Sequence, residues 1–167
     1  MTDSLRRLLL IAPLTVLVDQ TSKHLVMTGM RLGQSIPLLK GYLRLTYIRN
    51  PGAAFGFLST SSEAFRVPFF LGISFLAITV VLIFYLRSAQ GNTLLQVGLS
   101  LVLGGAVGNL IDRFRFHEVV DFIDLYFRQY HWPAFNVADS AISVGVTILL
   151  IDAVLTGRME KQNPEGT

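Results

Sequence analysis

Long apolar stretches alternate with polar segments along this chain, and each is close to the roughly 20 helical residues that cross the hydrocarbon core of a membrane. The stretches cover residues 8–27, 67–86, 94–111 and 137–155. The middle two contain no charged residue, whereas the last contains two acids. The pattern predicts an all-α membrane protein, in which four transmembrane helices form a single domain over residues 1–167.

The segments between these stretches differ in length. The first and third, residues 28–66 and 112–134, are much longer than the second, and in an antiparallel path of helices both lie at the same end of the bundle. Residues 42–49 alternate apolar and polar side chains with the period of a β-strand, which predicts a small sheet lying on the membrane. The turn residues at 50–52 and the small residues at 53–57 predict a cradle beside that strand. An interfacial helix or loop is also expected, and residues 112–134 are expected to be a connection of medium length.

The end of the bundle with the long connections collects most of the polar side chains near the membrane. They are Asp19, Lys23, Asn50, Asn109, Asp112, Arg113, Asp121, Asp124, Asn136 and Asp139. Ionisable groups within or beside transmembrane helices are costly, and they are therefore candidates for function when a partner can be named.

Two of these acids carry the main hypothesis. Asp121 lies between apolar residues, which disfavours its charged form, and Asp139 follows Asn136 by three positions, as an acid does in the first turn of a capped helix. If the two carboxyl groups meet, they cannot both ionise easily. One would then hold a proton while the other takes a proton from water, as in an aspartic protease.

The other charged groups suggest support rather than chemistry. Asp19 and Lys23, four residues apart on a helix, are expected to form an ion pair. Asp112 and Arg113 are expected to brace the site through a polar network, and Asp124 to face water.

Alternatives remain open on these residues alone. Asp121 and Asp139 could be structural acids of an interfacial loop and a helix terminus, in a non-catalytic membrane scaffold. A small proton-coupled transporter is a further alternative, although it predicts acids through the depth of the bundle rather than at one end.

Composition removes several other classes. The chain has no cysteine, so thiol proteases, disulfides and zinc–thiolate sites are excluded. The 14 Lys and Arg residues are scattered, which gives no nucleic-acid surface. His117 and Glu118 begin a zinc-like motif, but its last position is Asp121 instead of histidine, so no metal is expected. Two carboxyl groups and water need no cofactor.

Five separated blocks of the chain resemble the lipoprotein signal peptidases, also called signal peptidase II. The blocks lie at residues 18–23, 50–55, 104–113, 119–122 and 135–139, in the order of that family relative to the hydrophobic stretches. The resemblance implies an aspartic endopeptidase that removes the signal peptide of a diacylglyceryl-modified bacterial prolipoprotein, cutting on the N-terminal side of the lipidated cysteine.

The resemblance also assigns roles to residues. It places the catalytic pair at Asp121 and Asp139, and it gives site-lining or supporting roles to Asn50, Asn109, Asp112, Arg113, Asn136, Asp19 and Lys23. It implies a monomer in contact with membrane lipid, and binding of the family inhibitor globomycin at the acid pair.

The orientation in the membrane comes from the resemblance alone. The long connections carry more Lys and Arg than the termini, whereas Arg6 and Arg7 directly precede the first helix, so the charge pattern leaves the orientation open. The family implies the bacterial inner membrane, a site and sheet facing the periplasm, and both termini in the cytoplasm.

Overall fold

The computed structural model describes residues 2–52, 57–89 and 91–162, and for residues 158–162 it describes only the backbone. The helices are α1 (Asp3–Gly29), α2 (Glu63–Ser88), α3 (Thr93–Phe116) and α4 (Val137–Gln162). The strands are β1 (Ser35–Leu39), β2 (Leu43–Asn50), β3 (Val119–Phe127) and β4 (Tyr130–His131). Each apolar stretch of the sequence lies within one of the helices, so the predicted helical segments are confirmed.

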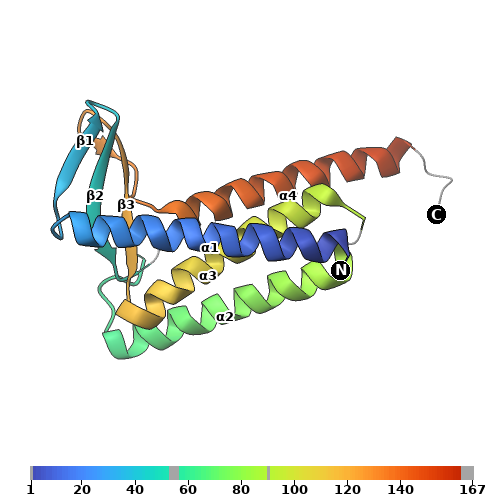
Figure 1. Cartoon of the computed structure of the whole chain (residues 1–167), viewed down its shortest axis with the longest axis horizontal. Coiled ribbons are helices and arrows are strands. Elements are labelled where there is room, and N and C mark those ends of the chain that lie inside the picture. Colours follow the sequence, from blue (N-terminus) through green and yellow to red (C-terminus); the bar gives the residue numbers. More distant parts are fainter. Residues whose placement is uncertain (1, 53–56, 90, 163–167) are drawn as a thin grey trace.

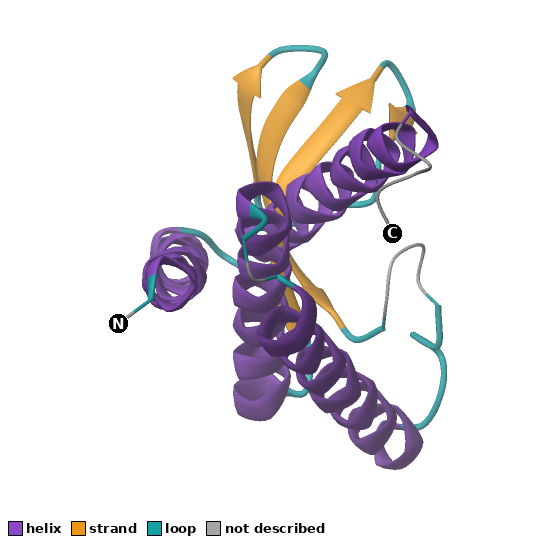
Figure 2. Cartoon of the chain, turned by 90° about the vertical axis from the view of Figure 1, so that its right-hand side faces the viewer, coloured by secondary structure: helices purple, strands orange, loops and turns teal. Residues whose placement is uncertain are grey.

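The helices run side by side, and the strands lie across one end of the bundle (Figure 1). Both long connections are at this sheet end, while the start of α1 and the last turns of α4 are at the far end. The antiparallel path predicted from the loop lengths is therefore confirmed. Figure 2 shows the hairpins of the sheet projecting beyond the side of the helices.

Three helices are long and apolar enough to cross a membrane within the described part of the chain, namely α2, α3 and residues 137–157 of α4. The polar residues Asp19, Gln20 and Lys23 lower the hydropathy of α1. Large apolar side chains such as Leu10, Leu76 and Leu150, which are 69%, 64% and 64% exposed, cover the outside of the bundle. An exposed apolar surface of this kind is typical of a protein that lies in lipid.

Helix α3 is the centre of the bundle, because α1, α2 and α4 all pack against it. Glycines allow the closest contacts. A Cβ atom on Gly105 would collide with the backbone oxygen of Ala138 in α4, and one on Gly108 would lie 2.6 Å from Oδ2 of Asp19 in α1. The small-residue face of α3 therefore brings polar atoms of three helices together.

The four strands form one antiparallel sheet in the order β1-β2-β3-β4. An irregularity between Leu45 and Ile48 interrupts the pairing of β2 with β3. The strand predicted over residues 42–49 is nevertheless confirmed as β2, and Leu45 and Tyr47 belong to one hydrophobic cluster, as the alternation predicted, whereas the Thr46 hydroxyl pairs with that of Ser35.

The segment after α3 differs from the prediction. Helix α3 continues to Phe116, and His117 ends it in the left-handed conformation, with a φ of 60°. The chain then forms strands β3 and β4 within residues 112–134, where only a connection was predicted. β3 is a strand because β2, which is distant in the sequence, offers it a pairing edge.

Candidate active site

Asn136 and Asp139 form a reciprocal cap at the start of α4. The backbone N–H of Asp139 donates to Oδ1 of Asn136 at 2.9 Å, and the backbone N–H of Asn136 donates to Oδ2 of Asp139 at 3.2 Å. This arrangement is a capping box, and it confirms the helix start predicted from the sequence. It fixes the Asp139 carboxyl group and leaves Oδ1 to accept a hydrogen bond from Nδ2 of Asn109 at 2.8 Å.

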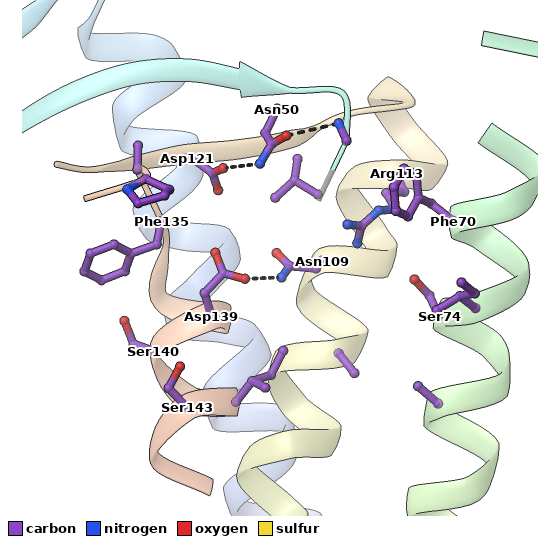
Figure 3. A pocket seen from close by; sticks show the side chains of 18 of the residues that line it. Asn50, Phe70, Ser74, Asn109, Arg113, Asp121, Phe135, Asp139, Ser140 and Ser143 are labelled. Atoms are coloured by element: carbon purple, nitrogen blue, oxygen red, sulfur yellow. Dashed lines mark hydrogen bonds between the residues drawn. The ribbon is translucent and has the colours of Figure 1, made fainter. Parts of the chain in front are cut away.

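Asp121 lies on β3 and is only 2% exposed. Its two carboxyl oxygens accept hydrogen bonds from asparagine side chains, Oδ2 from Asn50 at 2.9 Å and Oδ1 from Asn136 at 2.8 Å. Asn136 therefore contacts both acids, through its side chain to Asp121 and through its backbone to Asp139. In Figure 3 the two carboxyl groups point toward one another.

Burial, together with the nearby charge of Asp139, raises the pKa of Asp121 to about 7. The hydrogen bonds from Asn50 and Asn136 and the charge of Lys23 oppose this shift. Near neutral pH the Asp121 carboxyl group is thus protonated in a large fraction of molecules. A carboxyl group that holds a proton near neutral pH can act as an acid beside a second carboxyl group.

Lys23 is the centre of a buried charged network beneath the two acids. Its ammonium group lies 2.9 Å from Oδ2 of Asp19 and 2.8 Å from Oδ2 of Asp112, and it donates to Oδ1 of Asn109 at 3.0 Å. Asp19, Lys23 and Asp112 are each at most 1% exposed. The ion pair predicted between Asp19 and Lys23 is confirmed, and it extends to a second acid.

The same network holds the backbone beside each acid of the pair. Oδ1 of Asp19 accepts a hydrogen bond from the N–H of Ala138 at 2.9 Å, and Oδ2 of Asp112 accepts one from the N–H of Val120 at 3.0 Å. Ala138 and Val120 immediately precede Asp139 and Asp121. Lys23 therefore links the positions of the two acids through α1 and α3.

Gln20 is a member of this network that the sequence analysis gave no role. Its Nε2 lies 2.9 Å from Oδ1 of Asp112, 3.2 Å from Oδ2 of Asp19 and 3.1 Å from the carbonyl oxygen of Gly108. Its position next to Asp19 in a helix was the only available signal. The partners on α3 become visible only in the fold.

A pocket of about 800 Å³ opens beside the acids. Asn50, Asn109, Arg113, Asp121 and Asp139 line it, together with apolar side chains of α2, α3, α4 and residues 132–135. Arg113 lies with its guanidinium 5.3 Å from the ring centre of Phe70, and its electrostatic partners are Asp112, Asp121 and Asp139.

Asp124 does not face water, so this prediction is wrong. It is 4% exposed, and its carboxyl group contacts Arg44 at 2.6 Å and His131 at 2.9 Å. The cross-strand position of Arg44, opposite Asp124, explains how the acid can be buried.

The small-residue stretch 53–57 lies outside the described residues except for Phe57. Within the described ranges, no three His, Cys, Asp or Glu side chains converge to hold a metal ion.

Comparisons with known proteins agree with this geometry. Residues 11–155 match the family model described as signal peptidase (SPase) II. The chain belongs to the signal peptidase II family. The resemblance seen in the sequence is thereby confirmed, and membership of a peptidase family decides against the transporter and scaffold alternatives.

Curated relatives named lipoprotein signal peptidase cover most of the chain. That of Syntrophotalea carbinolica is 51% identical over 87% of this chain and 89% of the relative, and that of Desulforapulum autotrophicum is 47% identical over 92% and 94%. A solved structure described as a bacterial membrane enzyme superposes with a TM-score of 0.82 at 37% identity, covering 96% of this chain and 92% of the other. The fold and the membrane setting are thus those of this peptidase family.

Proposed function

We propose that this protein is the aspartic endopeptidase that removes signal peptides from diacylglyceryl-modified prolipoproteins, cutting on the N-terminal side of the lipidated cysteine. The family match and the names of the relatives support the substrate class. The observation that carries the mechanism is the meeting of Asp121 and Asp139 in one pocket, linked through Asn136.

In the proposed reaction, ionised Asp139 takes a proton from a water molecule, and the oxygen of that water attacks the scissile carbonyl carbon. Asp121, protonated because of its raised pKa, gives its proton to the carbonyl oxygen. The resulting diol collapses when Asp139 protonates the leaving nitrogen and the C–N bond breaks. A diol proton then returns to Asp121, so both acids regain their starting states.

The buried network supports α1 as a fourth transmembrane helix. The charged side chains of Asp19 and Lys23 are 0% and 1% exposed, because they pair with Asp112 and with each other inside the bundle. Charges that are paired within a bundle need not face lipid. We therefore infer four membrane crossings.

The inferred orientation places the sheet and the acids on the periplasmic side of the bacterial inner membrane and both termini in the cytoplasm. An acylated cysteine lies at the membrane surface, whereas its signal helix lies in lipid. The pocket suits such a substrate because it lies at the sheet end and is lined by α2, α3 and α4. We further propose that the protein acts as a monomer, as the family resemblance implies, and that globomycin binds in the same pocket.

Separate substitutions Asp121→Asn and Asp139→Asn test this proposal on a synthetic lipidated prolipoprotein peptide. Each is expected to reduce cleavage at least about 10³-fold, since each removes one half of the proton exchange. Asp3→Asn, at an acid whose side chain is 78% exposed at the far end, is the matched control and should cleave normally. An unlipidated peptide should resist the wild-type enzyme. Near-normal cleavage by either site variant would disprove the two-acid mechanism.

A further inference from the structure

Three serine side chains line the pocket below the acids, Ser74 on α2 and Ser140 and Ser143 on α4. The Ser140 hydroxyl donates to the carbonyl oxygen of Asn136 at 2.9 Å, so its proton is used within its own helix. Among the described residues, the hydroxyl groups of Ser74 and Ser143 have no hydrogen-bond partner. Two hydroxyl donors thus remain available at the pocket wall.

Both hydroxyl groups lie about one helical turn farther from the sheet than the polar centre of the site. Ser143 follows Asp139 by four residues and so shares its face of α4. Ser74 follows Phe70, the residue beneath Arg113, by four residues on α2. In Figure 3 the two serines stand on opposite walls of the pocket.

The pocket at this depth offers few other polar groups. The neighbouring wall consists of Ile73, Ala77, Ala106 and Ile142. The Nδ2 group of Asn109, the nearest amide donor above, already donates to Asp139. A polar group of a bound molecule at this level would therefore meet the two serine hydroxyls, while the second N–H of Asn109 and the Arg113 guanidinium lie nearer the acids.

A signal helix brings such polar groups into the pocket. The bond to be cut has to leave the helix to reach the acids, and a helix that ends leaves its last four carbonyl groups without intrahelical partners. In apolar surroundings an unpaired carbonyl group is costly. The end of the substrate helix thus needs hydrogen-bond donors just below the acids.

We propose that Ser74 and Ser143 donate hydrogen bonds to the carbonyl oxygens at the end of the substrate's signal helix. These contacts hold the helix end about one turn below Asp139 and thereby set which peptide bond reaches the acids. The inference rests on the proposed function, because it takes the pocket as the peptide-binding site.

The first test compares Ser74→Ala, Ser143→Ala and the double variant with matched threonine controls. Thr79→Ala and Thr147→Ala remove hydroxyl groups from the same two helices, but these hydroxyls donate at 2.8 Å to the backbone carbonyl oxygens of Phe75 and Ser143, and neither threonine lines the pocket. Each serine variant is expected to lower kcat/KM about three- to tenfold on a lipidated prolipoprotein peptide, and the double variant more. The controls should stay within about twofold. Equal effects in serine and threonine variants would overturn the proposal.

The second test identifies the contact itself. Peptide substrates carry a single ester in place of one backbone amide N-terminal to the cut, scanned along the helix end, since an ester carbonyl is a poorer acceptor. At the contacted position, the ester and the serine substitution together should lower kcat/KM by less than the product of their separate fold-changes. Ser143→Thr, which keeps a hydroxyl group, should restore most of the activity. Independent effects at every scanned position would disprove the contact.

These kinetics separate the inference from the proposed function. Serine variants with an intact acid pair still cleave, so a failed serine prediction leaves the two-acid mechanism standing. Failure of the proposed function would instead appear as cleavage by Asp121→Asn or Asp139→Asn.

Discussion

Polar side chains are buried at both ends of the helical bundle, but among the described residues only those at the sheet end are connected to the pocket. At the far end, the Tyr85 hydroxyl donates to the carbonyl oxygen of Ser4 at 2.6 Å, and Arg7 donates to Gln96 at 2.5 Å. None of these four residues, which we call the far-end cluster, lines the large pocket. At the sheet end, by contrast, the network around Lys23 reaches the two acids of the pocket through Asn109.

The comparison shows that burial of polar groups alone does not identify an active site. The far-end cluster joins α1, α2 and α3 by hydrogen bonds and contains one charged group. The sheet end contains several charged side chains, and polar side chains of this end, including Asp121 and Asp139, line a pocket. We expect substitutions at the far end to change stability alone, and those at the sheet end to change stability and catalysis together.

The largest expected effect on stability follows Lys23→Met. The substitution leaves Asp19 and Asp112 buried without their cation, which typically costs about 3–5 kcal/mol of folding free energy. Cleavage should also fall, because Asp19 and Asp112 accept hydrogen bonds from the backbone N–H groups of Ala138 and Val120, which precede the two site acids. The measurements are chemical unfolding in detergent micelles and the cleavage rate. Arg7→Met is the far-end counterpart and should cost about 1–3 kcal/mol with normal cleavage; equal losses of cleavage in both variants would refute the distinction.

The second prediction concerns pH. Because Asp121 has a pKa raised to about 7 and the proposed mechanism uses its protonated form, kcat/KM should fall as pH rises above about 7, by roughly tenfold per pH unit. In the folded state this group binds its proton more tightly than in the unfolded state. Its contribution to stability is therefore greatest below the unfolded pKa of 3.8 and is lost as pH rises through 7.

The pH-dependence of unfolding separates Asp121 from the other acids. Asp121→Asn should flatten the stability profile between these two pKa values, whereas Asp3→Asn should leave it unchanged. An activity profile that stays level up to pH 9 would contradict an essential proton on Asp121.

The smallest expected effect comes from Tyr85→Phe in the far-end cluster. The variant loses both hydrogen bonds of the Tyr85 hydroxyl with Ser4, one donated to the carbonyl oxygen and one accepted from the side-chain hydroxyl, which should cost about 1–2 kcal/mol of unfolding free energy. The cleavage rate should change less than about twofold, because Tyr85 lies in the last turns of α2, and this end of α2 is remote from the sheet (Figure 1). A cleavage defect larger than the stability loss explains would show that the two ends are coupled.

Local sequence signals were sufficient wherever a feature depended on near neighbours. The cap formed by Asn136 and Asp139 lies within four residues, and the ion pair of Asp19 with Lys23 lies within one helical turn. Both were predicted correctly for this reason. The prediction that Asp124 faces water was wrong because its partner Arg44 is on another strand. The role of Gln20 was missed because its partners Asp112 and Gly108 lie on another helix.

The sequence by itself determined the helical segments, their antiparallel path and the family, because apolar length, helix capping and motif order are properties of short stretches. The tertiary structure alone decided that residues 119–127 form a strand and that Lys23 joins the backbone beside both acids. Strand pairing and buried charge pairing depend on which distant segments meet. That information lies in the packing of the whole chain around α3.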